Sequence, residues 1–252
     1  MGERSGVLAG KVVLVTGGGR GIGEAIGLAA ASSGADVALL ATRAPDAARA
    51  RVEEIGGRAL ALTADVTSSG DVERAVHATL EEFGRIDVLV NNAAILHVGP
   101  LLTTDDDAFA RTLDVNVQGV FRMTRAVGRH MVERGGGVII NIGSDLAVRG
   151  RANYAAYCAS KGAVLQLTRA AAIELGQFGV RVVLLSPAVT NTELAAPALA
   201  DPRIRGELIA KGTLDRINEP EDVAAAAVFL ASPAARTVTG CNWPIDAGVL
   251  AR

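Results

Sequence analysis

A tyrosine and a lysine four residues apart are the first candidates for chemistry in this chain of 252 residues. The segment "NYAAYCASKG" (153–162) contains both tyrosines of the chain and one of its three lysines. Tyr157 and Lys161 share one face of a helix, whereas Tyr154 has Cys158 at that spacing. A free tyrosine has a pKa of about 10, and a nearby ammonium lowers it by favouring the phenolate. The pair predicts a general acid/base, with a packed aromatic residue beside a surface lysine as the alternative.

Two further polar residues precede this pair. Ser144 lies 13 positions before Tyr157, at the end of the apolar run "GVIINIGS", and the carboxyl end of such a strand is where ligands bind in open α/β sheets. Asn116, in "LDVNVQG", is a poor helix former within a segment that otherwise reads as helix. Each could instead be a solvated surface residue. The stretch "GSDLA" is not a G-x-S-x-G nucleophile elbow, so an esterase is disfavoured.

A glycine-rich loop follows the first apolar run, in "LVTGGGRGIGEAI". Its pattern is T-G-x-x-x-G-x-G, formed by Thr16, Gly17, Gly21 and Gly23. Backbone N–H groups at such a strand–turn–helix junction favour a bound pyrophosphate. A P-loop is excluded because its lysine is missing. The alternative is a tight turn without a ligand.

Short apolar runs alternate with longer alanine-rich segments along the chain. The predicted strands are 11–16, 36–41, 58–64, 86–90, 137–142, 180–186 and 242–246. The predicted helices are 22–33, 46–55, 69–83, 108–134, 153–178 and 219–231. Strands that are almost continuously apolar are typical of a parallel sheet covered on both faces.

This alternation predicts a Rossmann-type, doubly wound α/β fold: a seven-stranded, mostly parallel sheet with helices on both faces. No linker or repeat interrupts the chain, so residues 1–252 are predicted to form a single domain with an N-terminal tail at 1–9. Prolines break the rhythm after residue 186, and 188–215 is predicted to be a substrate loop or lid.

Composition excludes several classes of function. A net charge of −2 without a basic block argues against nucleic acid as a partner. Cys158 and Cys241 lie far apart and the histidines are isolated, so neither a disulfide scaffold nor a metal site is expected. The chain shows neither a signal peptide nor an apolar run that could span a membrane. We therefore expect a soluble, cytoplasmic protein that does not bind membranes.

Three motifs occur together in a recognisable order. TGxxxGxG near the start, "NNAA" (91–94) after the fourth strand and YxxxK in the middle resemble the short-chain dehydrogenase/reductase family, in its single-domain branch. The resemblance spans roughly residues 10–248. It implies reversible, NAD(P)H-dependent hydride transfer between a nicotinamide and a ketone or secondary alcohol. Within the family the chain resembles 3-oxoacyl-(acyl-carrier-protein) reductases. A polyol or sugar dehydrogenase is one alternative, and a non-catalytic NADP-binding sensor or scaffold is another.

The resemblance also implies roles for the four polar residues. Ser144 would orient the substrate oxygen, and Tyr157 would donate the proton. Lys161 would lower the Tyr157 pKa and hold the nicotinamide ribose. Asn116 would mark a local helix distortion that binds a water linking Lys161 to solvent.

The same resemblance implies a set of cofactor-binding residues. Asp65 and Val66 would lie at the adenine, Asn91 and Ala93 along the cleft, and Pro187, Val189 and Thr192 around the nicotinamide carboxamide. The rest belong to the glycine loop and the end of the second strand: Thr16, Gly17, Arg20, Gly21, Ile22, Gly23, Thr42 and Arg43.

The second strand bears on the choice of cofactor. An acid at its end would accept the ribose 2′-hydroxyl of NAD and repel the 2′-phosphate of NADP. This chain has Ala41 there, and Arg20 and Arg43 are candidate donors to a 2′-phosphate. NADP is therefore predicted over NAD, although both arginines could be solvated surface residues.

Some features depart from the family pattern or fall outside it. In "SPAVTNT", Ala188 replaces a usual glycine, which would be strained if that position needs a positive φ. His97 could line the substrate pocket, and Arg149 and Arg151 could attract an anionic substrate or be solvated loop residues. The resemblance further implies a homotetramer built on helices 108–134 and 153–178 and on the C-terminal "DAGVLAR".

Overall fold

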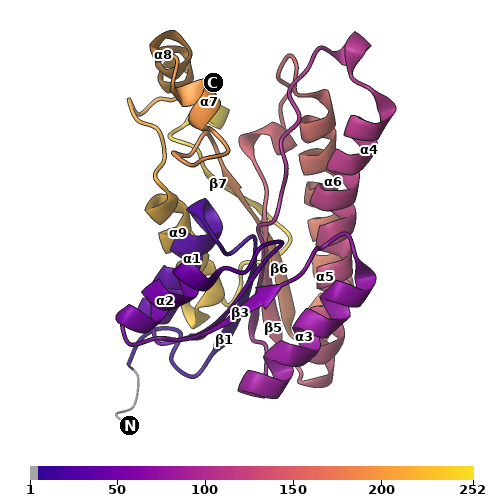
Figure 1. The fold of residues 1–252 in the computed structure, drawn as a ribbon, viewed down its shortest axis with the longest axis vertical. Coiled ribbons are helices and arrows are strands. Elements are labelled where there is room, and N and C mark those ends of the chain that lie inside the picture. Colours follow the sequence, from indigo (N-terminus) through magenta and orange to yellow (C-terminus); the bar gives the residue numbers. More distant parts are fainter. Residues whose placement is uncertain (1–4) are drawn as a thin grey trace.

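Runs of valine, leucine, isoleucine and alanine form the strands of a central sheet. In the computed structural model, which describes residues 5–252, seven strands pair in the order β3-β2-β1-β4-β5-β6-β7, and every pairing is parallel (Figure 1). They are β1 (Val12–Thr16), β2 (Asp36–Ala41), β3 (Arg58–Thr63), β4 (Val88–Asn91), β5 (Gly137–Ile142), β6 (Val180–Pro187) and β7 (Asn242–Ile245). The predicted doubly wound fold is confirmed, with a sheet that is wholly rather than mostly parallel.

Helices cover both faces of this sheet. They are α1 (Gly21–Ser32), α2 (Asp46–Glu54), α3 (Ser69–Phe83), α4 (Asp106–Leu113), α5 (Gly119–Glu133), α6 (Ala155–Gly176), α7 (Ala196–Leu199), α8 (Pro202–Ala210) and α9 (Pro220–Ala231). Helices α1, α2 and α9 form one layer and α3 to α6 form the other (Figure 1). None of the helices within residues 5–252 is long and apolar enough to cross a membrane.

The strands alternate between two hydrophobic clusters, because successive strand side chains point to opposite faces. In β1, Val13 and Val15 belong to the cluster under α1 and α9, while Leu14 belongs to the cluster under α3 and α5. The same alternation continues along β2. Both faces are therefore buried, which explains why the strands read as continuous apolar runs.

Three predicted segments differ in the structure. Residues 1–4 of the predicted tail lie outside the described residues, but Leu8 is buried in the core and its N–H donates to the Ser33 carbonyl. The predicted helix 108–134 is divided by a π-helical turn at Asp114–Gln118 between α4 and α5. The predicted lid 188–215 contains two short helices, α7 and α8, because Pro197 and Pro202 begin helices at their first turns rather than ending them.

The strand order reverses between β1 and β4, and this creates the crevice for a ligand. β1 pairs with β2 on one side and β4 on the other, so the chain winds away from this point in both directions. In a parallel sheet the loops after the strands gather at one edge. The glycine loop, the "NNAA" segment, Ser144 and the loop after Pro187 all leave the sheet at that edge.

Candidate active site

Tyr157 and Lys161 lie in the first two turns of α6 and face the carboxyl end of β5. Lys161 is only 4% exposed, and its Nζ donates a hydrogen bond of 2.7 Å to the carbonyl of Ile142. The same Nζ lies 5.5 Å from the centre of the Tyr157 ring. Lys161 is therefore a buried residue of the site and not the surface lysine of the alternative interpretation.

Burial changes the pKa values of both residues in opposite directions. Burial raises the pKa of Tyr157, the charge of Asp145 raises it further, and a hydrogen bond with Ser144 lowers it. Burial lowers the pKa of Lys161 to about 8. The net pKa of Tyr157 is raised because desolvation of the phenolate outweighs the hydrogen bond with Ser144. The effect of Lys161 on this pKa stays a prediction.

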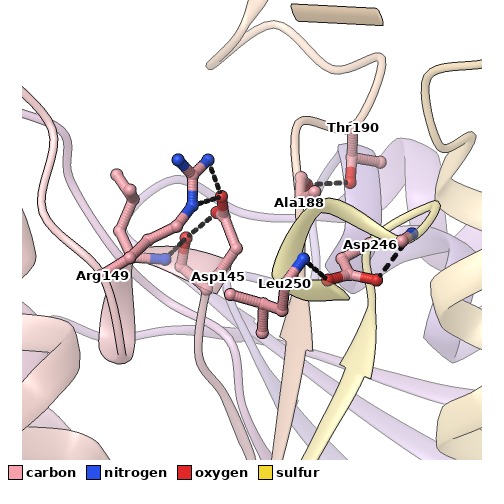
Figure 2. Close-up of polar contacts among 9 residues, drawn as sticks. Asp145, Arg149, Ala188, Thr190, Asp246 and Leu250 are labelled. Atoms are coloured by element: carbon pink, nitrogen blue, oxygen red, sulfur yellow. Dashed lines mark hydrogen bonds and ion pairs between the residues drawn. The ribbon is translucent and has the colours of Figure 1, made fainter. Parts of the chain in front are cut away.

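Ser144 lies two residues beyond β5 and begins a short 3₁₀ turn, Asp145–Ala147. Its Oγ accepts a hydrogen bond of 3.1 Å from the N–H of Leu146 and donates one of 2.9 Å to Oδ1 of Asp145. Asp145 is buried and also accepts hydrogen bonds from Arg149 (Figure 2). Sequence reasoning missed Asp145, although an acid directly after the candidate serine was visible in "GSDLA".

Asn116 lies in the π-helical turn and hydrogen-bonds the segment that follows β4. Its Oδ1 accepts from the N–H of Ile95 at 2.8 Å, and its Nδ2 donates to the carbonyl of Ile95 at 2.9 Å and to Oγ of Ser160 at 3.1 Å. The predicted local distortion of the helix is present at this position. The side chain itself joins the segment after β4 to α6 and has no hydrogen bond with Lys161 among the described residues.

The glycine loop has the backbone geometry of an anion-binding turn. Gly17 and Gly21 adopt φ values of +64° and +55°, which side chains other than glycine rarely adopt. A Cβ at Gly23 would lie 2.3 Å from the carbonyl oxygen of Gly17. Helix α1 begins here without a side-chain cap, so its first N–H groups are free to bind phosphate oxygens. The loop therefore fits the pyrophosphate of a dinucleotide.

Asparagine and threonine side chains hold this loop against β4. Thr16 Oγ1 accepts from the N–H groups of Asn92 and Ala93 at 2.9 and 3.0 Å. The side chain of Asn92 donates to the carbonyls of Thr16 and Gly17 at 3.0 and 3.1 Å. Asn91, the predicted residue, is buried on the opposite side, where Nδ2 donates to Asn141 at 2.8 Å. The side chain beside the loop is thus Asn92, because the two residues point to opposite faces of the strand.

The remaining predicted cofactor residues lie at the same edge of the sheet. Asp65 accepts from the N–H and hydroxyl of Thr67, and Val66 is buried after β3. Arg20, Ile22, Thr42 and Arg43 lie around the glycine loop and the end of β2. Among the described residues, neither Arg20 nor Arg43 has a carboxylate partner, and both are exposed. They are free to meet a phosphate.

The loop after β6 approaches the glycine loop from the other side. Thr192 lies over Gly21, where a Cβ would be 3.2 Å from the threonine methyl. Pro187 ends β6, and the N–H of Ala188 donates to the carbonyl of Ile245 at 3.0 Å. Ala188 is not among the described residues with a positive φ, which are Asn153 and Ala247 besides glycines. The expected strain from the alanine is therefore absent at this position.

A small pocket opens beside the 3₁₀ turn, next to the predicted lid. Its lining is mixed. The charged residues are Asp145, Arg149, Lys211, Arg216 and Asp246, and the larger apolar ones are Val189, Leu208, Ile217 and Val249. Leu208 of helix α8 and Asp246, Ala247 and Val249 of the C-terminal segment form part of its wall.

Other residues singled out by the sequence have specific places. Arg151 stacks over the ring of Tyr154, with its guanidinium carbon 4.4 Å from the ring centre, and Tyr154 precedes α6. His97 is partly buried, and its Nε2 has no hydrogen-bond partner among the described residues. Within residues 5–252, no three histidine, cysteine or carboxylate side chains are grouped so that they could hold a metal ion.

The known proteins that this chain resembles are dehydrogenases and reductases. A family model described as enoyl-(acyl carrier protein) reductase matches residues 17–250. The chain is 41% identical to a D-threitol dehydrogenase of Mycolicibacterium smegmatis over 246 residues, which cover 96% of the chain and 93% of that protein. It is 37% identical to an L-rhamnose 1-dehydrogenase (NAD(P)(+)) of a Sphingomonas species, with 96% and 97% covered. The crystal structure of a 3-ketoacyl-(acyl-carrier-protein) reductase from Brucella melitensis, complexed with NADH, superposes with a TM-score of 0.87 at 40% identity, covering 96% of this chain and 99% of that one.

The buried amine of Lys161 generates a testable prediction about stability. Below pH 8 Lys161 is charged in the folded protein, so burial of the charged amine lowers the free energy of unfolding in full. Between about pH 8 and 10.5 the amine is neutral in the folded state and still charged in the unfolded state, so this cost disappears as the pH rises. We expect Lys161→Met to raise the free energy of unfolding by about 2 kcal/mol at pH 7, after the lost Ile142 hydrogen bond is deducted. This gain should shrink as the pH rises through the same window. Urea unfolding at neutral and alkaline pH measures it.

Lys11 is the matched control, because it lies at the surface near Asp87 and its side chain is 41% exposed. Lys11→Met should not raise the free energy of unfolding at pH 7, and its effect should not change between neutral and alkaline pH. A Lys161→Met protein that is destabilised equally at both pH values would contradict the assignment of a costly buried charge.

Proposed function

Because this chain belongs to the short-chain dehydrogenase/reductase family, we propose that Tyr157, Ser144 and Lys161 carry its chemistry. The chain is an NAD(P)-dependent oxidoreductase that acts on CH–OH groups and interconverts secondary alcohols and ketones. The observation that supports the assignment of residues is the buried group at the end of β5. There a tyrosine, a serine and a lysine face one another where the crevice of the sheet opens.

Each residue has a distinct part in the proposed mechanism. A bound nicotinamide supplies or accepts the hydride. In reduction, Tyr157 donates its phenolic proton to the substrate oxygen, and its raised pKa keeps that proton in place until the oxygen becomes basic. Ser144 donates a hydrogen bond to the same oxygen and stabilises the charge that develops on it. In oxidation, Tyr157 takes the hydroxyl proton back.

Lys161 and Asn116 do not contact the substrate in this mechanism and act through Tyr157 and Ser144. Lys161 is held by the Ile142 carbonyl beside Tyr157, so its charge stabilises the phenolate in the step that forms it. Asn116 holds the loop after β4 against α6 and so keeps the cleft open at one width. The glycine loop and the first turn of α1 hold the pyrophosphate, and Thr192 lies over them.

The pocket favours a small polar substrate. Carboxylates and cations stand among its apolar lining residues, and these groups can hydrogen-bond the hydroxyls of a polyol, which an acyl chain lacks. A polyol or sugar dehydrogenase therefore fits this pocket better than a 3-oxoacyl reductase, which was the first reading of the sequence. The D-threitol dehydrogenase at 41% identity agrees with that choice.

Turnover with a substrate panel tests the proposed function. We expect oxidation of NADPH or NADH with keto sugars and small hydroxy ketones, and slower turnover with 3-oxoacyl esters and diketones. Tyr157→Phe should reduce kcat by a factor of about a thousand or more while cofactor binding, followed by fluorescence titration, is retained. Cofactor binding without turnover of any compound would instead support the sensor.

NADP is the cofactor that we propose over NAD. β2 ends at Ala41, where no carboxylate repels a phosphate, and Arg20 and Arg43 lie exposed nearby without carboxylate partners among the described residues. Arginine binds phosphate through several charge-assisted hydrogen bonds at once. The two side chains together would recognise the 2′-phosphate.

The cofactor assignment predicts a selective defect. Arg43→Ala should raise the KM for NADPH about tenfold or more and leave the KM for NADH unchanged, since each charge-assisted hydrogen bond contributes at that level. Arg49→Ala is a control on α2, because the Arg49 guanidinium is paired with Glu53 at 2.6 Å. A wild-type enzyme with a clearly lower KM for NADH would overturn the NADP assignment.

The protein is further proposed to be a cytoplasmic homotetramer. Both cysteines are free, which suits a reducing compartment. Large apolar side chains are exposed on the layer of α4, α5 and α6, and these are Phe109, Phe121, Ile173 and Phe178. Ile173, on α6, is 83% exposed. An apolar face of this kind on two neighbouring long helices is typical of an interface.

Light scattering tests this assembly. The wild-type protein should have the mass of four chains, and Ile173→Glu should reduce it, because a buried, unpaired carboxylate at an interface is costly. Ile55→Glu provides the control, since Ile55 is also exposed but lies at the end of α2, in the opposite layer. A monomeric wild type would contradict the proposal.

A further inference from the structure

Asp145 has a place in the site but no part in the reaction described above. It is 5% exposed and follows Ser144 in the 3₁₀ turn. Both donors of Arg149, Nε and a terminal nitrogen, converge on its Oδ2, the first at 2.8 Å. Its Oδ1 accepts from a single group among the described residues, the hydroxyl of Ser144 at 2.9 Å (Figure 2). The two carboxylate oxygens thus accept hydrogen bonds from different residues.

The reaction removes the donor that Oδ1 has among the described residues, the hydroxyl of Ser144. A carboxylate is an acceptor only, so the single proton of Ser144 points to Asp145 in this structure. To stabilise the substrate oxygen, Ser144 must turn that proton toward the substrate. Oδ1 would then be a buried carboxylate oxygen without a hydrogen bond, which is costly.

Among the described residues, no other side chain donates to Oδ1. Both hydrogen bonds from Arg149 to Asp145 end on Oδ2 in this structure, and the N–H of Leu146 donates to Ser144. Lys211 is exposed, on the far wall of the same pocket. Because Asp145 lines the pocket, the replacement donor can come from the molecule that fills it.

We propose that a second hydroxyl of the substrate, on the carbon next to the reacting carbon, donates to Oδ1 of Asp145. Oxygens on adjacent carbons lie about one hydrogen-bond length apart, which is also the separation of Ser144 Oγ and Asp145 Oδ1. A substrate whose reacting oxygen meets Ser144 therefore brings its neighbouring hydroxyl to Asp145. The substrate class is a vicinal diol, oxidised to an α-hydroxy ketone. This assignment rests on the proposed role of Ser144.

The reaction balances without a further reactant. The reacting carbon of the diol loses its hydride to the oxidised nicotinamide, and its hydroxyl proton passes to Tyr157. The neighbouring hydroxyl stays intact and remains the donor to Asp145. A monohydroxy alcohol can undergo the same chemistry, but it leaves Oδ1 unpaired while Ser144 serves the reacting oxygen. The site therefore discriminates between a vicinal diol and a monohydroxy alcohol, because a buried polar group disfavours a substrate that cannot hydrogen-bond with it.

Three four-carbon substrates test the proposal with the wild-type enzyme: 2,3-butanediol, 2-butanol, and 1,3-butanediol, whose hydroxyls are not adjacent. We expect kcat/KM for the vicinal diol to exceed that of the other two by about a hundredfold or more, the scale at which an unpaired buried group is rejected. Comparable values for the vicinal diol and 2-butanol would overturn the inference. Turnover of none of the three, nor of any keto compound with either cofactor, would instead contradict the proposed function.

Variants separate recognition by Asp145 from a structural role. Asp145→Ala should reduce the preference for the vicinal diol over 2-butanol to within about fivefold, because no carboxylate oxygen is then left unpaired when 2-butanol is bound. Asp145→Asn keeps the shape of the side chain, so it controls for a folding defect in Asp145→Ala. It should retain an intermediate preference, because an amide also bonds a hydroxyl.

Asp246→Asn is the matched control for these variants. Asp246 lines the same pocket, but both of its oxygens already accept backbone N–H groups, from Gly248 at 2.9 Å and Leu250 at 2.8 Å. The preference for the vicinal diol should persist in this variant. An Asp145→Ala enzyme that loses activity toward the vicinal diol and 2-butanol by the same factor would show that Asp145 only supports the fold.

Discussion

One buried hydrogen bond ties the catalytic helix to the sheet. The amine of Lys161 on α6 donates to the carbonyl of Ile142, the last residue of β5, at 2.7 Å. Tyr157 lies one turn before Lys161, and Ser144 lies two residues after Ile142, so the same contact sets the tyrosine opposite the serine. Sliding α6 along the sheet would leave a buried amine and a buried carbonyl unpaired, and each would cost more than a surface contact returns. The alignment of the site is therefore a consequence of polar groups that must be paired.

Burial also determines how the ionisable groups behave. Desolvation raises the pKa of Tyr157 and lowers that of Lys161, so it favours the neutral form of both. Stabilising the phenolate then depends on short-range contacts, and two neighbours act in opposite senses. Ser144 lowers the Tyr157 pKa through a hydrogen bond, while the charge of Asp145 raises it. Arg149 pairs with Asp145 and offsets part of that charge. The pKa of Tyr157 thus depends on residues of a neighbouring loop as well as on burial.

The sequence predicted most of the fold, because parallel strands buried on both faces leave a strong apolar signal and helices alternate between them. The glycine loop and the tyrosine–lysine pair were also readable, since their chemistry depends on local spacing. What could not be read depends on contacts across the fold. Whether Asn91 or Asn92 faces the loop depends on strand orientation, and the helices of the lid form where prolines suggested irregular structure. The net rise of the Tyr157 pKa could not be predicted, because spacing along a helix says nothing about desolvation.

Cofactor and substrate are recognised by different kinds of structure. The cofactor edge relies on backbone geometry that tolerates little change, such as the positive φ of Gly17 and its contact with Asn92. The pocket proposed for the substrate is lined by side chains of the predicted lid and of the C-terminal segment. There Ala247 adopts a φ of +51°, unusual for a residue with a side chain, while its carbonyl accepts the N–H groups of Thr213 and Leu214 at 2.8 and 3.0 Å. These hydrogen bonds hold the strained turn against the segment after α8 and so join the two walls of the pocket. A change of substrate in such a fold requires new side chains on these walls, and the glycine loop can stay as it is.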